Sequence, residues 1–344
     1  MSDIDIRVTG QIGRITFTRP KALNAMTYDM CMAIDAALTL WAEDHRIAMV
    51  ALDAEGDKAF CAGGDIAELY ATGTQGNYDY GRTFWRDEYR LNARIFEYPK
   101  PVVSLMQGFV MGGGVGIGCH GSHRVVCETT QIAMPECGIG LVPDVGGSLI
   151  LALAPGRLGE YLGTTGARMG PADAIHCGFA DTYIPREKWN DLLVLLEASG
   201  DPSHVEAMAH PLPAGPLQQA QGKIDRCFGG ETLGDVLTEL HHTDSDFAAA
   251  TRKTMGRNSP LSMACAIEMV HRLREPGTDL REALELEYRY TFRSMEHGDF
   301  LEGIRAQIID KDRNPNWQYA DLHVPATAVS QMLMPLGADT LTFD

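Results

Sequence analysis

The sequence predicts an α/β protein, and three observations carry this prediction. Short apolar runs of the length of buried strands alternate with segments of helical periodicity. The order is strand, strand, helix, and it repeats, which is typical of sheets whose strands are joined by crossovers. The chain has 344 residues, 45% of them hydrophobic and 22% charged, so it can bury a large core.

The elements of the first third can be predicted in order. Residues 4–17 predict two short strands around a turn at residues 9–11. Thr27 is expected to cap a helix that runs to about Glu43, because apolar side chains recur there near helical spacing: Met30, Ile34, Leu38 and Trp41. The next elements are a buried strand, a glycine loop, a helix and a second buried strand: residues 47–54, 60–66, 83–97 and 101–108.

The rest of the chain is predicted to be mostly helical. A glycine run at 111–121 precedes two short strands in HRVVCE and QIAMPE, and helical patterns dominate residues 146–198. Residues 201–216, rich in Pro, Ala and His, predict a linker. Residues 217–310 predict further helices, one of them capped by Ser259 ahead of Pro260. We expect a core domain that holds the site, a helical region that covers it and a tail that is an extended or a surface segment, at residues 1–200, 217–317 and 318–344.

Charge and composition exclude several classes of protein. The net charge of −17 has the wrong sign for a nucleic-acid binder, so no nucleic-acid partner is expected. No apolar run reaches the length of a membrane span, and no membrane partner is expected. The eight cysteines include no C-x-x-C pair and predict reduced, buried thiols. The acidic start MSDIDIRV resembles neither a secretory nor a mitochondrial leader, so a cytoplasmic location is expected.

The glycine runs do not predict a nucleotide fold. GIGCHG at 116–121 matches G-x-G-x-x-G, but the preceding strand ends near Gly108, several residues too early for a dinucleotide site. The chain contains no phosphate-binding G-x-x-x-x-G-K-[ST] loop and no G-x-S-x-G serine elbow. Two pairs of histidines lack cysteine or carboxylate partners at ligand spacing, so no metal site is predicted: His120 with His123, and His241 with His242.

A different use of the glycines is favoured. Two glycine turns, at 62–64 and 112–114, let backbone N–H groups approach a ligand without a side chain in the way. Two such groups that converge on one point form an oxyanion hole. The segment MPECGIGLVPDVGG adds two acids, Glu136 and Asp144, to an otherwise apolar stretch. From the residues alone these acids fit a catalytic pair or a turn cap and a turn acid after Pro143, and this alternative stays open.

Several motifs together resemble the crotonase superfamily, which has the enoyl-CoA hydratase/isomerase fold. They are RPKALNAM, AFCAGGDI, PVVSLMQGFVMGGGVGI and AMPECGIGLVPDVGG, and the resemblance covers residues 10–200. The later segments SPLS and EGIRAQIIDKDRNPNW resemble one branch, the 3-hydroxyisobutyryl-CoA hydrolases and their relatives. The resemblance implies a crotonase (ClpP-like) fold of repeated ββα units with a C-terminal helical region. It also implies an acyl-CoA substrate that carries its own CoA, so no separate cofactor is expected.

The resemblance assigns residues to an active site. It implies that the N–H groups of Ala62 and Gly113 hold the thioester oxygen and that Glu136 and Asp144 are catalytic. Glu88, in the predicted helix FWRDEYRLN, and Gly113 would bind substrate beside these two acids. The CoA moiety is polyanionic, so backbone from the first glycine turn and nearby cations would contact it: Ala62, Gly63, Gly64, Asp65, Lys21, Arg305, Lys311 and Arg313.

One departure from the hydratase pattern indicates the reaction. Gly116 stands where hydratases carry their first glutamate, and Asp144 stands where they carry a glycine. The resemblance therefore implies hydrolysis of a short 3-hydroxyacyl-CoA, most directly 3-hydroxyisobutyryl-CoA in valine breakdown. Hydration or isomerisation of a short acyl-CoA is the alternative, and a non-enzymatic binding member is a second one. Superfamily members often form trimers and hexamers, although the hydrolase branch need not, so a homo-oligomer is one expectation.

Overall fold

The structure, a computed structural model, describes residues 3–343 and divides into two compact units. The sheet unit comprises Met1–Asp65, Asp87–Ala133 and Arg168–Gln218. The helical unit comprises Ile66–Arg86, Met134–Ala167 and Gln219–Asp344. The units interleave along the chain, unlike the linear division predicted from the sequence, since residues 134–167 group with the C-terminal helices.

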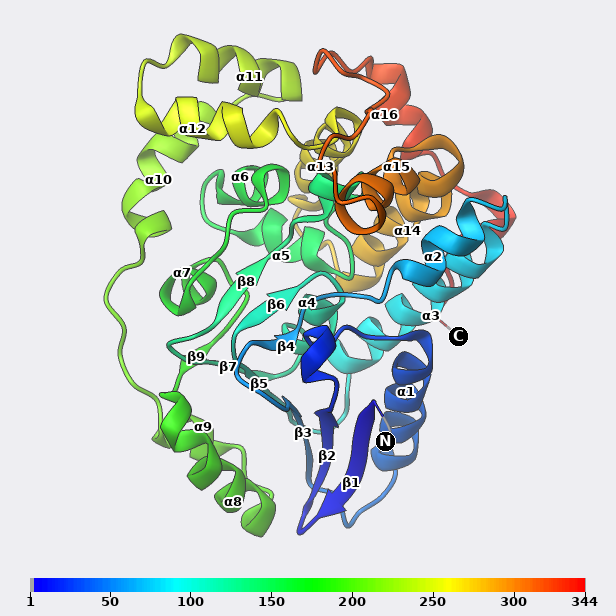
Figure 1. The fold of residues 1–344 in the computed structure, drawn as a ribbon. Helices are drawn as coiled ribbons and strands as arrows, with labels where there is room; N and C mark the ends of the chain where they lie inside the picture. The colour runs from blue at the N-terminus through cyan, green and yellow to red at the C-terminus, as the bar shows by residue number, and fades with distance from the viewer. Residues whose placement is uncertain (1–2, 344) are drawn as a thin grey trace. The chain divides into compact units, whose positions relative to one another are not determined.

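The sheet unit contains two sheets (Figure 1). The larger has the order β1-β2-β3-β5-β7-β9, in which β1 is antiparallel to β2 and the other neighbours are parallel. The smaller is parallel and has the order β4-β6-β8. The strands are Ile4–Thr9, Ile12–Phe17, Met49–Ala54, Ala59–Cys61, Val102–Met106, Phe109–Met111, His123–Val126, Gln131–Ala133 and Thr182–Tyr183, for β1 to β9 in order. The α/β class and the early strands are confirmed.

Helices of the sheet unit follow the predicted signals. Thr27 caps α1, and its side chain accepts a hydrogen bond from the N–H of Met30. Trp189 begins α8 and packs into the core of the larger sheet with Ile12 and Val103. A short helix, α9, lies within the predicted linker. The helices that lie wholly in this unit are α1 Tyr28–Ala42, α4 Gly113–Gly118, α7 Pro171–His176, α8 Trp189–Ser199 and α9 Ser203–Ala207, and its 3-10 turns are η1 Pro20–Ala22 and η3 Arg186–Lys188. Helices α3 (Asp79–Phe96) and α10 (Pro216–Cys227) have residues in both units.

The helical unit is organised around α13 (Pro260–Leu273), which contacts α5 and α6. Ser259 caps α13 as predicted, with its hydroxyl accepting from the N–H of Ser262 at 3.1 Å. The remaining elements are α2 Ala67–Gly73, η2 Glu136–Ile139, α5 Gly147–Leu153, α6 Leu158–Thr165, α11 Leu233–His242, α12 Asp246–Met255, α14 Leu280–His297, α15 Phe300–Ile304, the π-helical turn η4 Arg305–Ile309, α16 Ala326–Met332 and η5 Gly337–Asp339. The tail, which the sequence predicts to be an extended or a surface segment, contains α16, which contacts α13 and α14 and buries Met332.

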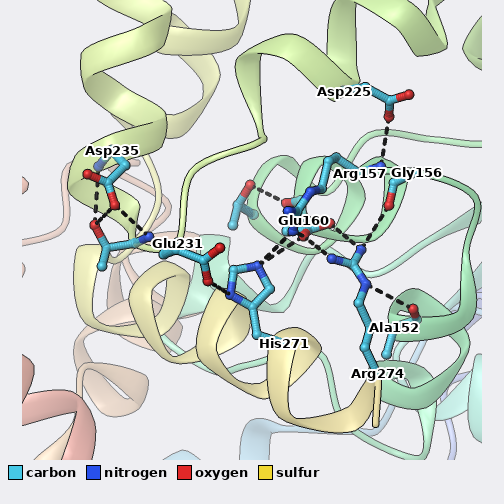
Figure 2. Close-up of polar contacts among 11 residues, drawn as sticks. Ala152, Gly156, Arg157, Glu160, Asp225, Glu231, Asp235, His271 and Arg274 are labelled. Carbon is cyan, nitrogen blue, oxygen red and sulfur yellow. Dashed lines mark hydrogen bonds and ion pairs between the residues drawn. The ribbon is translucent and has the colours of Figure 1, made fainter. Parts of the chain in front are cut away.

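A buried ion cluster joins α6 to α13 (Figure 2). The carboxylate of Glu160 accepts hydrogen bonds from Arg157 at 2.8 Å, from Arg274 at 2.7 Å and from the ring of His271 at 3.0 Å. Arg274 also donates to the carbonyl groups of Ala152 and Gly156, so the cluster holds the end of α5 as well. Burial alone would raise the pKa of Glu160, but these donors outweigh it and lower the pKa to about 2.

No helix within residues 3–343 is long and apolar enough to cross a membrane.

Candidate active site

The first glycine turn is held by the segment RPKALNAM. Leu23 and Asn24 adopt left-handed backbone conformations, with φ of 52° and 54°. The amide of Asn24 donates to the carbonyl groups of Ala59, at 2.8 Å, and Glu55, at 3.0 Å. Met26 completes the attachment, because its N–H donates to Gly63 and its carbonyl accepts from Asp65. This segment is therefore a scaffold for residues 61–65.

The predicted role of Ala62 in the oxyanion hole is wrong. Its N–H donates to the carbonyl of Leu23 at 3.1 Å and is not available to a ligand. The next turn residue, Gly63, has φ of +111°, a conformation that favours glycine. Within residues 3–343, two N–H groups of this turn have no backbone acceptor, those of Gly63 and Gly64.

Gly64 lies beside Gly113, the first residue of α4. A Cβ added to Gly113 would stand 3.4 Å from the backbone nitrogen of Gly64. The N–H of Gly113 is at a helix start, where no intrahelical acceptor exists. Gly114 is required for this approach, because its added Cβ would stand 2.1 Å from the carbonyl oxygen of Cys61. The structure thus brings two uncommitted N–H groups together, one from each predicted glycine turn.

Glu88, also in the sheet unit, lies beside Gly113. It lies on α3 and is 3% exposed. Its Oε1 atom is 2.8 Å from the position of a Cβ on Gly113, so any side chain at 113 would collide with it. Burial first, and the charge of Glu88 second, raise the pKa of Cys31, and burial with a smaller contribution from Glu88 raises the pKa of Cys61 to about 12. Both thiols are therefore protonated, and neither is suited to nucleophilic chemistry.

Glu136 and Asp144 lie in the helical unit and are each 4% exposed. Glu136 begins η2, whose cap is Pro135, and no side chain caps this turn. The Oε2 atom of Glu136 is buried and has no hydrogen-bond partner in the described part of the chain. Burial first, and then the charges of Asp144 and Glu287, raise the pKa of Glu136 well above its usual range. A buried, underused carboxylate next to a second one fits the catalytic interpretation better than a turn cap.

Glu287 is a third acid in this group, and the sequence analysis missed it. It lies on α14, is fully buried, and accepts hydrogen bonds from the N–H of Gly146 at 2.8 Å and of Ser148 at 3.2 Å. The Ser148 hydroxyl also donates to it. A signal was present, since Glu287 interrupts a buried stripe at helical spacing: Leu280, Ala283, Leu284, Tyr290, Thr291 and Ser294.

The predicted CoA-binding cations differ in their contacts. Arg305 donates to the side chains of Glu302, Asp310 and Asp312 and to the carbonyl of Asn314. These contacts use all five N–H groups of its guanidinium, so a CoA phosphate would have to replace one of them, and the contact of Arg305 with CoA stays a prediction. Three other cations are exposed and remain predictions: Lys21, Lys311 and Arg313.

Asp65 ends the first glycine turn and is predicted to contact CoA. The carboxylate of Asp65 accepts from Arg19 at 3.2 Å, which ties the first glycine turn to the scaffold segment. No group of His, Cys, Asp and Glu side chains able to hold a metal ion occurs among the residues that the structure describes.

The fold, the N–H groups of Gly64 and Gly113, and the buried acids Glu136 and Asp144 define a class of protein. It is the class of crotonase-type enzymes that act on acyl-CoA. A family model described as enoyl-CoA hydratase/isomerase matches residues 12–333, and the chain belongs to this family. It is 37% identical to the mitochondrial 3-hydroxyisobutyryl-CoA hydrolase of Danio rerio, over 93% of this chain and 86% of that protein. It is 35% identical to the enzyme of the same name from Homo sapiens, over 97% of this chain and 89% of that protein.

Solved structures confirm the crotonase fold. An enoyl-CoA hydratase from Rhodobacter sphaeroides superposes with a TM-score of 0.95 and is 53% identical, over 99% of this chain and 100% of that one. A carnitinyl-CoA dehydratase from Mycobacterium thermoresistibile superposes with a TM-score of 0.94 and is 39% identical, over 100% of this chain and 99% of that one. The names of the relatives therefore divide between a hydrolase and a hydratase or dehydratase.

Proposed function

We propose that this chain hydrolyses a short 3-hydroxyacyl-CoA thioester, with 3-hydroxyisobutyryl-CoA as its substrate and valine breakdown as its context. The observation that carries the proposal is the buried pair Glu136 and Asp144, combined with glycine at position 116. Hydration across a double bond uses two acids in this family's pattern, and α4 offers none at that place. The names of the Danio rerio and Homo sapiens relatives support the same reaction.

The proposed chemistry assigns one task to each group. The N–H groups of Gly64 and Gly113 stabilise the negative charge that develops on the thioester oxygen, an effect of about 10²–10³ in rate per donor. Glu88 and Asp144 bind substrate, with Asp144 assigned to the 3-hydroxyl or to orienting the attacking group. The C–S bond breaks, and the CoA thiolate leaves and takes up a proton. The exposed Lys21 and Lys311 are proposed contacts for the phosphates of CoA, together with backbone from Gly63 to Asp65.

Two roles are open to Glu136. As a general base it takes a proton from the water that attacks the thioester carbonyl. As a nucleophile its carboxylate attacks that carbonyl, and water then hydrolyses the mixed anhydride. A single turnover in ¹⁸O-water separates the two routes, because only the anhydride route leaves the label in Glu136.

The first test is the release of free CoA from 3-hydroxyisobutyryl-CoA, followed by chromatography because the eight cysteines would react with a thiol dye. Crotonyl-CoA is given in parallel. We expect CoA release and no hydration. Hydration of crotonyl-CoA without CoA release would overturn the proposal, support the hydratase named in the Rhodobacter sphaeroides structure, and make Asp144 the second acid.

Replacing Gly114 by alanine should lower kcat for CoA release by about 10²–10³. The added methyl group would stand 2.1 Å from the Cys61 carbonyl, so the backbone that carries the N–H groups of Gly64 and Gly113 must move. Gly222→Ala is the matched control, because nothing lies within 4 Å of its added Cβ. Wild-type kcat in a folded Gly114→Ala variant would contradict the assigned oxyanion hole.

A cytoplasmic location is a further part of the proposal. All eight cysteines are free and buried, as in proteins from reducing compartments. The relatives from Danio rerio and Homo sapiens are named as mitochondrial, which describes those proteins. Fractionation of the source cells with an antibody to this chain tests the location.

A further inference from the structure

The turn that carries Asp144 is held from a distant part of the chain. Val145 has φ of +52°, which is uncommon for a β-branched residue, and Gly146 follows with φ of +79°. A valine in this region is strained and persists only where its surroundings hold it. The turn then enters α5, whose N-cap, Gly146, has no side chain to satisfy the first N–H groups.

Glu287 supplies the missing restraint from α14. One carboxylate oxygen accepts from the N–H of Gly146, and the other accepts from the N–H and hydroxyl of Ser148. The acceptor of these hydrogen bonds is the fully buried carboxylate of Glu287. Buried hydrogen bonds to a carboxylate are stronger than those exposed to water. The backbone on the C-terminal side of Asp144 is therefore positioned by a residue 143 places further along the chain.

Glu287 also acts on the pair through charge. Burial, followed by the charge of Asp144, raises the pKa of Glu287 to about 8, although its three hydrogen bonds oppose the rise. The charge of Glu287 in turn contributes to the raised pKa of Glu136. The repulsion between these buried carboxylates therefore adds to burial in raising the pKa of Glu136 and the pKa of Glu287.

The other titratable groups that interact with Glu136 or with its neighbours are two thiols, a phenol and the carboxyl group of Asp299, whose charge acts on Tyr290 and whose pKa is raised by burial. Cys137 is adjacent to Glu136 in the chain, and Cys265 on α13 and Tyr290 on α14 interact with Cys137 or with each other. Burial raises the pKa of all three.

We propose that Glu287 is a positioning residue for Glu136 and Asp144: from α14 it holds the Asp144 turn through its hydrogen bonds to Gly146 and Ser148, and its carboxylate is the third acid of this buried group. This inference rests on the proposed function only for its kinetic readout. Glu287 is not assigned any contact with substrate.

The test compares pH profiles of Glu287→Gln and wild type. The amide keeps the size of the side chain but removes its charge and one acceptor oxygen. We expect kcat to fall by about 10- to 100-fold through misplacement of the pair, with KM changed less than kcat. We also expect the acidic limb of the kcat profile to move to lower pH by on the order of one unit, because Glu136 loses a negative neighbour. An unchanged acidic limb overturns the proposal, whatever happens to kcat.

Two further variants complete the design. Glu285→Gln is the control on the same helix; it is partly exposed, pairs with Arg289, and should leave the profile unchanged. Ser148→Ala removes one donor to Glu287 and covers the case in which Glu287→Gln does not fold. Its acidic limb should also move to lower pH, because Glu287 without this donor holds its proton more strongly.

A readout without substrate separates this inference from the proposed function. The ¹³C NMR titration of labelled glutamate carboxyl groups should show a lower pKa for Glu136 in Glu287→Gln. If wild type releases no CoA while this pKa falls, the proposed function fails and the role of Glu287 stands. If wild type releases CoA and neither the acidic limb nor the titration moves, the role of Glu287 fails.

Discussion

Glu136→Gln should lower kcat for CoA release by about 10²–10⁴, the range expected when a general base or a nucleophile is lost. Glutamine keeps the shape of the side chain but cannot accept a proton or attack the thioester. The Oε2 atom of Glu136 has no hydrogen-bond partner among residues 3–343, so few contacts are lost with it. We therefore expect KM to change by less than tenfold, and Asp144→Asn is measured beside it.

The same variant should gain stability relative to wild type as pH rises. The pKa of Glu136 is raised in the folded protein, so its contribution to stability is fully present below the unfolded pKa and is lost as pH rises through the folded one. Glutamine does not ionise and escapes this loss. Urea unfolding at pH 5 and pH 8 measures the difference. A large fall in kcat with no gain in relative stability at pH 8 would contradict the buried, high-pKa state of Glu136.

Glu160→Gln should lower the free energy of unfolding by about 3–5 kcal/mol, the cost of breaking a buried ion pair on one side. The substitution leaves Arg157 and Arg274 without the carboxylate that both contact (Figure 2). It should also remove part of the acid sensitivity of the fold. The pKa of Glu160 falls from 4.5 to about 2 on folding, so wild type loses about 3 kcal/mol as pH falls from about 5 to 2.

Chemical unfolding of both proteins between pH 3 and pH 7 measures these effects. Glu268→Gln is the control, because Glu268 pairs with Arg272 on the exposed side of α13, the helix that contributes His271 to the cluster. It should change stability by no more than about 0.5 kcal/mol. A stability difference between Glu160→Gln and wild type that does not shrink toward pH 3 would show that the ion cluster is not the source of the loss.

The sequence by itself determined the features that depend on local pattern. Apolar spacing identified the helix that begins after Thr27, and Ser259 with Pro260 identified the start of α13. The two glycine turns identified the backbone that forms the paired N–H groups, since only glycine allows φ of +111° at residue 63 and the close approach at residue 114. The acids Glu136 and Asp144 stood out because they are charged residues in a stretch that is otherwise apolar. In each case the signal and the structure it predicts lie within a few residues of each other.

Only the tertiary structure decided which of these groups are available for chemistry. The N–H of Ala62 is committed to Leu23, 39 residues earlier, and the N–H of this turn that lies beside Gly113 is that of Gly64. Arg305 is committed to three carboxylates on a turn that the sequence did not predict. Glu287 reaches the Asp144 turn from α14. The physical reason is common to all three: each donor or acceptor forms a limited number of hydrogen bonds, and packing between distant segments selects the partner that takes them.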